Sequence, residues 1–456
     1  MDSIRITIDA SHTAGSGKNT GIERVVRNLC RNIQAVADAR SLGETQVATH
    51  IHGSFFPLDV RQTQSLSRLA RWESDVQAFV PHWLQAIPLA IADRWPNGKM
   101  RKWLRPSPSH LGGYKIPHML YARAINLNRY FRGGAVIPSN RDLLILPDYW
   151  NTPKIWDTAA RYRQAGAFVA TVVYDLIPWT HPEFVGHNRR QKFRQYLEGA
   201  IRNSDLIIAI SRTVRDDIVR YMDDQMDVRS ESLCRDIRSF TLGAEIHQSS
   251  GGSIRPEIAS LFAASQRNAP YLMVGSFDPR KNHRQAMDAF DELWNVNRDF
   301  KLCMFGRTGS MCGDVMARIR NHPMLKRGLY VFHDANDAEL QYAYQNASGV
   351  LLPSIVEGFG LPIVESLWHG KRTFVSDTPI HREVGGDQCD FFELGNPRSL
   401  AKAILDWEAE RERVGIWKPN IHRTIPTTWE GSAVQFLDHC LDAYADRKGK
   451  TLSRAA

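Results

Sequence analysis

The chain has 456 residues, of which 43% are hydrophobic, and a formal net charge of +9 at pH 7. It is longer than one hydrophobic core usually supports and apolar enough for two, so we expect two domains. Its six cysteines lack metal-type spacing, its first residues lack the apolar region of a signal peptide, and no apolar run is long enough to span a bilayer. From these features we expect neither export nor a membrane-spanning helix, and we predict a cytoplasmic protein with reduced thiols.

The first predicted strand covers residues 4–9, and a helix is predicted over residues 22–36. The loop between them contains Gly-Ser-Gly-Lys18, which is superficially similar to a phosphate-binding loop. It lacks the first glycine and the final Ser or Thr of a Walker A motif, so we reject that interpretation. A plain flexible loop explains the segment as well as a binding loop does.

Residues 94–141 form a strongly basic segment without a single acidic residue and with interleaved aromatic side chains. This pattern is typical of a peripheral contact with an anionic membrane, where each basic residue adds about 1 kcal/mol. Nucleic acid would suit the same residues, but no nucleic-acid motif accompanies them, and we expect no such partner. A solvated insertion is the other interpretation.

Three further short apolar runs in the first half predict strands at residues 142–147, 167–174 and 205–211. A polar, flexible linker is predicted near residues 242–253. Strands alternate with helical segments, which favours a doubly wound α/β unit.

A second series of strands follows the linker, and this indicates a second complete sheet. The predicted strands lie near residues 271–274, 301–305, 329–332, 349–353, 373–376 and 390–393. The predicted fold class is therefore α/β, with two Rossmann-like doubly wound domains facing a cleft. We predict an N-terminal domain over 1–253, a C-terminal domain over 254–426 and a terminal helix with tail over 427–456.

Two cations follow the first strand of the second half. The strand is followed by Gly275, and Arg280 and Lys281 stand where the next helix is about to begin. The forked donors of arginine and the compact charge of lysine suit a diphosphate leaving group. Taken alone, they could be exposed loop charges.

Two glutamates, Glu357 and Glu365, flank a glycine-rich turn at the start of a helix predicted over residues 361–369. Gly358 and Gly360 permit close backbone approach, and the helix start directs free N–H groups at the loop. Both carboxylates can therefore face one crevice and accept hydrogen bonds from sugar hydroxyls. Alternatively, the first glutamate caps the helix and the second is a solvated surface charge.

The motif E-x7-E with Gly-Phe-Gly-Leu-Pro inside it resembles the signature of glycosyltransferase family 4, whose members retain anomeric configuration and have the glycosyltransferase-B fold. The resemblance implies that Glu357 contacts the donor hexose and Glu365 the ribose. It also implies that Arg280 and Lys281 bind the diphosphate. The remaining residues expected to bind the donor are Gly275, Phe359, Gly360, Leu361 and Gly21.

The first half departs from the family at one position, because Tyr174 stands where members often carry a histidine near the reacting sugar. The candidates there for contacts with acceptor or phosphate are Lys18, Asp175, His181 and Arg212. A helix cap, an ordinary loop histidine and a solvated arginine explain the last three equally well or better. The segment around residues 427–444 resembles the family's terminal helix, which crosses back onto the first domain.

The sequence therefore predicts a hexosyltransferase, with mannose as the first guess, that uses GDP-mannose or a UDP-hexose. The predicted acceptor is a surface glycan, such as an O-antigen or a capsule, or a lipid-linked oligosaccharide. There is no Asp-x-Asp triplet, so we predict metal-independent transfer without a cofactor. The alternatives are an epimerase or phosphorylase of the same fold, and a non-catalytic protein that binds nucleic acid or membranes.

Overall fold

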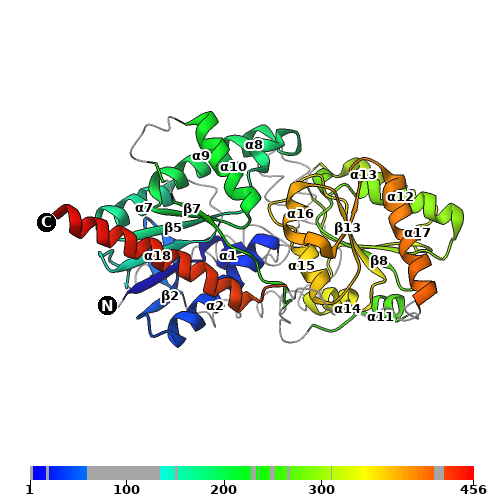
Figure 1. Cartoon of the computed structure of the whole chain (residues 1–456), viewed down its shortest axis with the longest axis horizontal. Helices are drawn as coiled ribbons and strands as arrows, with labels where there is room; N and C mark the ends of the chain where they lie inside the picture. Colours follow the sequence, from blue (N-terminus) through cyan, green and yellow to red (C-terminus); the bar gives the residue numbers. More distant parts are fainter. Residues whose placement is uncertain are drawn as a thin grey trace, which may run out of the picture.

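The computed structural model describes residues 4–16, 20–58, 134–148, 153–226, 233–234, 236–246, 252–263, 268–309, 311–414 and 426–455. These residues form two α/β lobes that lie side by side, each built around one sheet (Figure 1). The C-terminal helix lies on the first lobe, so the chain passes from the first lobe to the second and back.

The first sheet has the strand order β3-β2-β1-β4-β5-β6-β7 within the described residues. All neighbours pair in parallel except β2 and β3, which form an antiparallel hairpin at one edge. The strands are β1 (Arg5–Asp9), β2 (Thr45–Ile51), β3 (Ser54–Pro57), β4 (Asp142–Leu146), β5 (Phe168–Val173), β6 (Leu206–Ala209) and β7 (Ile237–Ser239). The helices are α1 (Ser11–Ser16), α2 (Gly21–Ala39), α7 (Lys154–Gln164), α8 (Ile177–Thr180), η2 (Pro182–Phe184), α9 (His187–Asn203) and α10 (Arg212–Gln225).

The second sheet has the order β10-β9-β8-β11-β12-β13, and its described strands are all parallel. The strands are β8 (Tyr271–Val274), β9 (Leu302–Phe305), β10 (Leu329–Phe332), β11 (Gly349–Leu352), β12 (Thr373–Ser376) and β13 (Asp390–Phe392). The helices are α11 (Pro256–Phe262), η3 (Pro279–Lys281), α12 (His283–Val296), α13 (Gly313–Arg320), α14 (Asp337–Asn346), α15 (Leu361–Trp368), α16 (Pro379–Gly385), η4 (Gly386–Gln388) and α17 (Pro397–Val414). The predicted class, two doubly wound α/β sheets, is confirmed.

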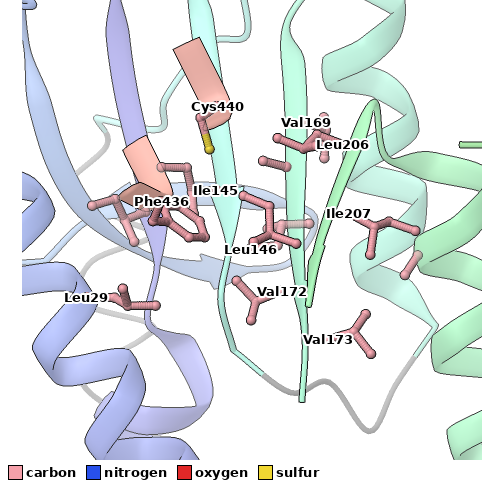
Figure 2. Packing of buried hydrophobic residues seen from close by; sticks show 14 of the residues in the cluster. Leu29, Ile145, Leu146, Val169, Val172, Val173, Leu206, Ile207, Phe436 and Cys440 are labelled. Atoms are coloured by element: carbon pink, nitrogen blue, oxygen red, sulfur yellow. The ribbon is translucent and has the colours of Figure 1, made fainter. Parts of the chain in front are cut away.

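The central strands are mostly apolar because helices cover both faces of each sheet. Asp142 in β4 and Thr171 in β5 are polar exceptions. All residues of β4, β5 and β6 are buried. Figure 2 shows their side chains packing next to Leu29 of α2 and Phe436 of the last helix. The second sheet has its own clusters on its two faces, so each lobe has a core of its own.

The last helix, α18 (Trp429–Ala455), packs against α2 of the first lobe. Trp429 is almost completely buried, and its indole N–H donates to the carbonyl of Glu245 at 3.0 Å. A Cβ atom at Gly243 would lie only 2.5 Å from the backbone nitrogen of Trp429, so the glycine allows this close approach. The domain boundaries near 253 and 426 stay predictions; the first sheet ends at Ser239 and the second begins at Tyr271.

Candidate active site

Three of the predicted residues meet at the carboxyl edge of the second sheet. Arg280 and Lys281 follow β8, and Glu357 follows the neighbouring parallel strand β11. Parallel neighbours end at the same edge of a sheet, which brings these loops together. Arg280 Nη1 lies 2.8 Å from Glu357 Oε2, and Lys281 Nζ contacts Glu357 Oε1. We call these three residues the charged triad.

The backbone around the charged triad is tightly fixed. Arg280 and Lys281 form the short helix η3, which ends at Asn282 in the left-handed conformation (φ 55°) before α12 begins. The carbonyl of Arg280 accepts a hydrogen bond from the N–H of Ile355 at 2.8 Å, which joins the loop after β8 to the loop after β11. The stem of Lys281 lies against Gly275, where a Cβ atom would sit 3.4 Å from the lysine side chain. Gly275 therefore leaves room for the lysine.

The electrostatics of the charged triad favour the ionised carboxylate. Burial would raise the pKa of Glu357, but Lys281 and Arg280 together lower it well below its usual value of 4.5. Burial opposes the charge on Arg280, yet Glu357 and Asp175 raise its pKa above 12.5. For Lys281 burial is the larger effect, and its pKa falls below 10.5. The buried Glu357 carboxylate thus holds the charged groups of Arg280 and Lys281 in place at the edge of the sheet.

The depressed pKa of Glu357 has a consequence for stability that can be measured. A carboxylate with a folded pKa below its unfolded value stabilises the fold at every pH above the unfolded value, and this contribution is lost as the pH falls through the folded pKa. We therefore expect the free energy of unfolding to differ between the wild type and Glu357→Gln by a constant amount around neutral pH. The difference should shrink only below pH 4.5.

Urea unfolding of both proteins at a series of pH values measures this difference. Glu412→Gln, at an exposed position of α17, is the control and should show no such pH dependence. A difference that fades between about pH 8 and pH 6 would mean that Glu357 has a raised pKa and would contradict the assignment.

The first lobe brings Asp175 to the charged triad. Its carboxylate accepts from the N–H of Ile177 at 3.1 Å, and its charge interacts with Arg280 and Glu357. Burial raises the pKa of Asp175, while Arg280 lowers it in part. Asp175 therefore closes a local turn but is not the helix cap that the sequence also suggested, because the N-cap of α8 is Leu176. Its carboxylate also interacts with Arg280 of the second lobe.

Tyr174 and His181 do not join the charged triad. The Tyr174 hydroxyl donates to the carbonyl of Pro147 at 2.5 Å, and burial raises the pKa of this phenol well above 10. Tyr174 is thus a packing residue of the first sheet. The described contacts of His181 are local: its Nδ1 lies 3.0 Å from the Thr180 hydroxyl, and its ring stacks on Phe184.

Glu365 lies one turn into α15 and is buried, with a side chain only 1% exposed. Its Oε1 accepts from Arg24 Nη2 of the first lobe at 2.5 Å, and its Oε2 accepts from the Tyr344 hydroxyl at 2.8 Å. The interpretation of Glu365 as a solvated surface charge is wrong. Glu357 does not cap α15 either, since the helix has no side-chain cap and begins after Gly360 in a left-handed conformation (φ 93°).

The glycine-rich loop packs against the first lobe. The carbonyl of Gly358 accepts from Ser211 Oγ at 2.8 Å, and Phe359 is buried in the hydrophobic cluster of the first lobe. A Cβ atom at Gly21 would lie 3.9 Å from Leu361, so the start of α2 is next to the start of α15. The predicted donor residues Gly21, Phe359, Gly360 and Leu361 therefore lie along the contact between the lobes.

Arg212 lies at the start of α10, and its side chain is 67% exposed. Its backbone N–H donates to Glu383 of α16 at 2.6 Å, and the N–H of Thr213 donates to the same carboxylate at 2.8 Å. Arg212 thus contacts Glu383 of the second lobe through its backbone and through its side-chain Nε at 3.6 Å, while most of its side chain is exposed. Lys18 lies outside the described residues.

Sequence reasoning missed several residues of this region. Arg24 and Tyr344 both bind Glu365, and Ser211 binds the glycine-rich loop. His381 is fully buried behind Gly360; its Nδ1 lies 2.9 Å from the Ser376 carbonyl, and its Nε2 has no hydrogen-bond partner among the described residues. The sequence offered a signal for two of these residues, because Arg24 lies three residues after the candidate Gly21 and Ser211 directly precedes the candidate Arg212.

Two further predictions concern metal and membrane. The described part of the chain contains no group of three or more His, Cys, Asp or Glu side chains placed to hold a metal ion. Among the helices that the structure describes, none combines the length and apolarity needed to cross a bilayer. Of the basic segment 94–141, residues 94–133 lie outside the described residues.

Part of the chain matches a known protein family. Residues 260–423, which carry the charged triad and Glu365, match the family model of glycosyl transferases group 1. The serotype-specific mannosyltransferase WbdA of Escherichia coli is 28% identical over 344 residues, which cover 72% of this chain and 42% of that protein. The O-antigen chain mannosyltransferase B of Escherichia coli is 26% identical over 48% of this chain and 55% of its own length. The chain thus spans about two fifths of the length of WbdA.

Among solved structures, the sucrose-phosphate synthase of Thermosynechococcus elongatus superposes with a TM-score of 0.51 at 13% identity, covering 99% of each chain. A likeness at this identity concerns the fold alone, and the fold is glycosyltransferase-B. The two α/β lobes, each with its own mostly parallel sheet core, thus have the architecture of the glycosyltransferase-B fold. The chain is thus similar over residues 260–423 to the group 1 glycosyl transferases and, at 26–28% identity, to two mannosyltransferases of Escherichia coli.

Proposed function

We propose that this protein is a retaining hexosyltransferase that moves a hexose from a nucleoside-diphosphate sugar to a hydroxyl of a glycan. GDP-mannose is the first candidate donor, because the related proteins are mannosyltransferases at 24–28% identity. A UDP-hexose is the second. The acceptor is a surface glycan or a lipid-linked oligosaccharide, in keeping with the O-antigen relatives.

The observation that carries this proposal is the charged triad, which places two cations and one carboxylate at the carboxyl edge of the second sheet and opposite Asp175. Negative charge grows on the diphosphate as the bond to the sugar breaks. The fork of Arg280 and the ammonium group of Lys281 would stabilise that charge, and fixed charges perform this task without a metal. Glu357 would then orient the hexose through its hydroxyl groups.

The proposed reaction proceeds on one face of the sugar. The C–O bond between the anomeric carbon and the diphosphate breaks, the acceptor oxygen forms the new C–O bond on the same face, and the acceptor proton passes to the departing diphosphate. Backbone N–H groups of residues 359–361 would bind further sugar hydroxyls, and Glu365 would bind the ribose. The products are a nucleoside diphosphate and the extended glycan.

The basic segment 94–141 supports a proposal about where the acceptor comes from. Its one-signed charge and aromatic residues suit peripheral contact with an anionic membrane. Such contact would place the protein at the cytoplasmic face of the membrane and bring a lipid-linked acceptor near the cleft. We propose no nucleic-acid partner.

The test of this function uses radiolabelled GDP-mannose and UDP-glucose, each with and without an acceptor glycan. We expect wild-type protein to transfer label only when acceptor is present, and Glu357→Ala to lose transfer while it still binds GDP or UDP. The loss should be on the order of 10²-fold or more, because the sugar is no longer oriented. Glu412→Ala, at an exposed position of α17, is the matched control.

Four results would contradict the proposal. Full transfer by Glu357→Ala would remove the assigned role of this residue. Rearrangement of the labelled sugar without acceptor would instead indicate an epimerase, and phosphate-dependent cleavage a phosphorylase. Salt-dependent binding of oligonucleotides with no affinity for any nucleotide sugar would indicate a non-catalytic protein.

A further inference from the structure

Arg24 of the first lobe reaches into the second lobe and pairs with Glu365. Its Nη2 lies 2.5 Å from Glu365 Oε1, and the hydroxyl of Tyr344 lies 2.8 Å from Glu365 Oε2. Arg24 belongs to α2, Tyr344 to α14 and Glu365 to α15, so three helices from two lobes meet at one carboxylate. Neither lobe alone provides this arrangement.

The pair is well shielded from water. The side chain of Arg24 is 16% exposed and that of Glu365 is 1% exposed, while Tyr344 is completely buried. Burial disfavours the charge on Arg24, but the nearby Glu365 more than compensates and raises its pKa. Burial also raises the pKa of Tyr344, so its hydroxyl remains a donor. Charge-assisted hydrogen bonds in such surroundings are strong and hold the carboxylate in one orientation.

The position of this carboxylate relates it to the proposed donor site. Glu365 lies on the helix whose start carries the glycine-rich loop, and that loop begins at Glu357 of the charged triad. The first residue of α2, Gly21, lies beside Leu361, the first residue of α15. Arg24, one turn along α2, therefore reaches Glu365 from the opposite lobe.

A carboxylate that already accepts two hydrogen bonds can still accept others. Its two oxygens provide about four acceptor positions in all, and Arg24 and Tyr344 use one on each oxygen. One acceptor position per oxygen remains, which matches the two neighbouring hydroxyl groups of a ribose. The Glu365 side chain is only 1% exposed in this arrangement, so a ribose would enter with the lobes apart. Arg24 would then return to the carboxylate as the lobes close and fix the oxygens that the sugar uses.

We infer that Arg24 is a positioning residue that couples binding of the donor ribose at Glu365 to closure of the two lobes. The inference rests on the proposed function, because it takes Glu365 as the ribose contact. When the lobes close, Arg24 orients the carboxylate, and a ribose bound to that carboxylate in turn favours the closed arrangement. By linkage, each of the two contacts strengthens the other.

The competing explanation is that Arg24 only holds the two lobes together. A second contact between the lobes provides the comparison. Glu383 of α16 accepts hydrogen bonds from the backbone N–H groups of Arg212 and Thr213 of α10, so it also joins the two lobes. This contact does not involve α2 or α15, the helices that carry Arg24 and Glu365. If Arg24 only held the lobes together, its loss and the loss of Glu383 would affect every nucleotide alike. If Arg24 acts through Glu365, its loss would affect the recognition of ribose hydroxyls specifically.

The experiment measures dissociation constants of GDP and UDP and of their 2′-deoxy counterparts by calorimetry. Wild-type protein should bind the 2′-deoxy nucleotides more weakly than the ribonucleotides. In Arg24→Ala, GDP and UDP should bind at least about fivefold more weakly, and the discrimination against the 2′-deoxy forms should shrink by a similar factor. Glu365→Gln should show the same loss of discrimination.

Two controls and one rescue separate the explanations. Glu383→Ala should weaken ribo- and deoxynucleotides equally and keep the discrimination. Arg40→Ala removes an arginine at the end of α2 that pairs with Asp438 within the first lobe, and it should bind like wild type. Arg24→Lys keeps the charge and should restore part of the discrimination; it also serves if Arg24→Ala does not fold.

If Arg24→Ala discriminates against the 2′-deoxy nucleotides as strongly as wild type does, the inference is overturned and the proposed function stays intact. If Arg24→Ala does not fold, unchanged discrimination in both Arg24→Lys and Glu365→Gln leads to the same conclusion. Equal losses of affinity in Arg24→Ala and Glu383→Ala for all four nucleotides would also overturn the inference and would indicate that Arg24 only holds the lobes together. A wild-type protein that binds neither GDP nor UDP would instead contradict the proposed function itself.

Discussion

Replacing Arg280 by alanine is expected to lower the kcat of hexose transfer by about 10²- to 10³-fold. Arg280 is the forked donor of the charged triad, 2.8 Å from Glu357, and no other arginine among the described residues contacts that carboxylate. Without it, the charge that grows on the departing diphosphate would be met by Lys281 alone. Glu357 would also lose one of the two partners that keep it ionised in a buried place. Initial rates of transfer with saturating donor measure the effect.

Arg280→Lys and Arg398→Ala complete this experiment. Lysine keeps the charge but not the fork, so Arg280→Lys should recover only part of the rate. Arg398 stands on α17 with a side chain that is 84% exposed, and its replacement by alanine should leave kcat unchanged. A normal kcat in a folded Arg280→Ala protein would show that the diphosphate is held elsewhere.

Gly358→Ala is expected to reduce kcat/KM for transfer by on the order of 10²-fold or more while each lobe stays folded. A Cβ atom at Gly358 would lie 2.0 Å from the carbonyl oxygen of Tyr174 and 3.1 Å from the Cβ of Asp175. Backbone of the first lobe cannot swing aside as a flexible side chain could. The glycine-rich loop would therefore have to move away from the first lobe, and Glu357 and Asp175 would no longer face each other as they do.

The control for this substitution is Gly186→Ala. Gly186 has a φ of −60°, and no heavy atom would lie within 4 Å of an added Cβ, so alanine is tolerated there on geometric grounds. We expect this variant to keep both its rate of transfer and its melting temperature. Wild-type kcat/KM in Gly358→Ala would mean that the close contact between the loop and the first lobe is not part of the working arrangement.

The second lobe was predicted from sequence almost strand by strand, because its signals are local. Buried parallel strands such as β8 and β11 are short apolar runs, and each is followed by a loop and then a helix. Once two such strands are neighbours, the residues just after them must meet. The convergence of Arg280, Lys281 and Glu357 therefore follows from a pattern that the sequence contains.

The edges of the first sheet were not predicted. Strands β2 and β3 form an antiparallel hairpin, and β7 has only three residues, all of them half-buried. Edge strands face solvent in part, so their composition is mixed and lacks the apolar run that marks a central strand. The hairpin also breaks the alternation of strand and helix on which the sequence-based prediction of this half relied.

The sequence by itself determined the two-sheet class and the residue types gathered at the edge of the second sheet, because strand periodicity and turn chemistry act over a few residues. Only the tertiary structure decided which charges became buried. Arg24 and Glu365 are separated by 341 positions, and Ser211 and Gly358 by 147, and no local pattern relates such pairs. Glu365 is buried because Arg24 of the opposite lobe covers it. Tyr174 is a packing residue because its hydroxyl donates to the carbonyl of Pro147, which follows the neighbouring strand. The physical reason is that charge pairing and close packing depend on distance in space, which the fold sets and the order of residues does not.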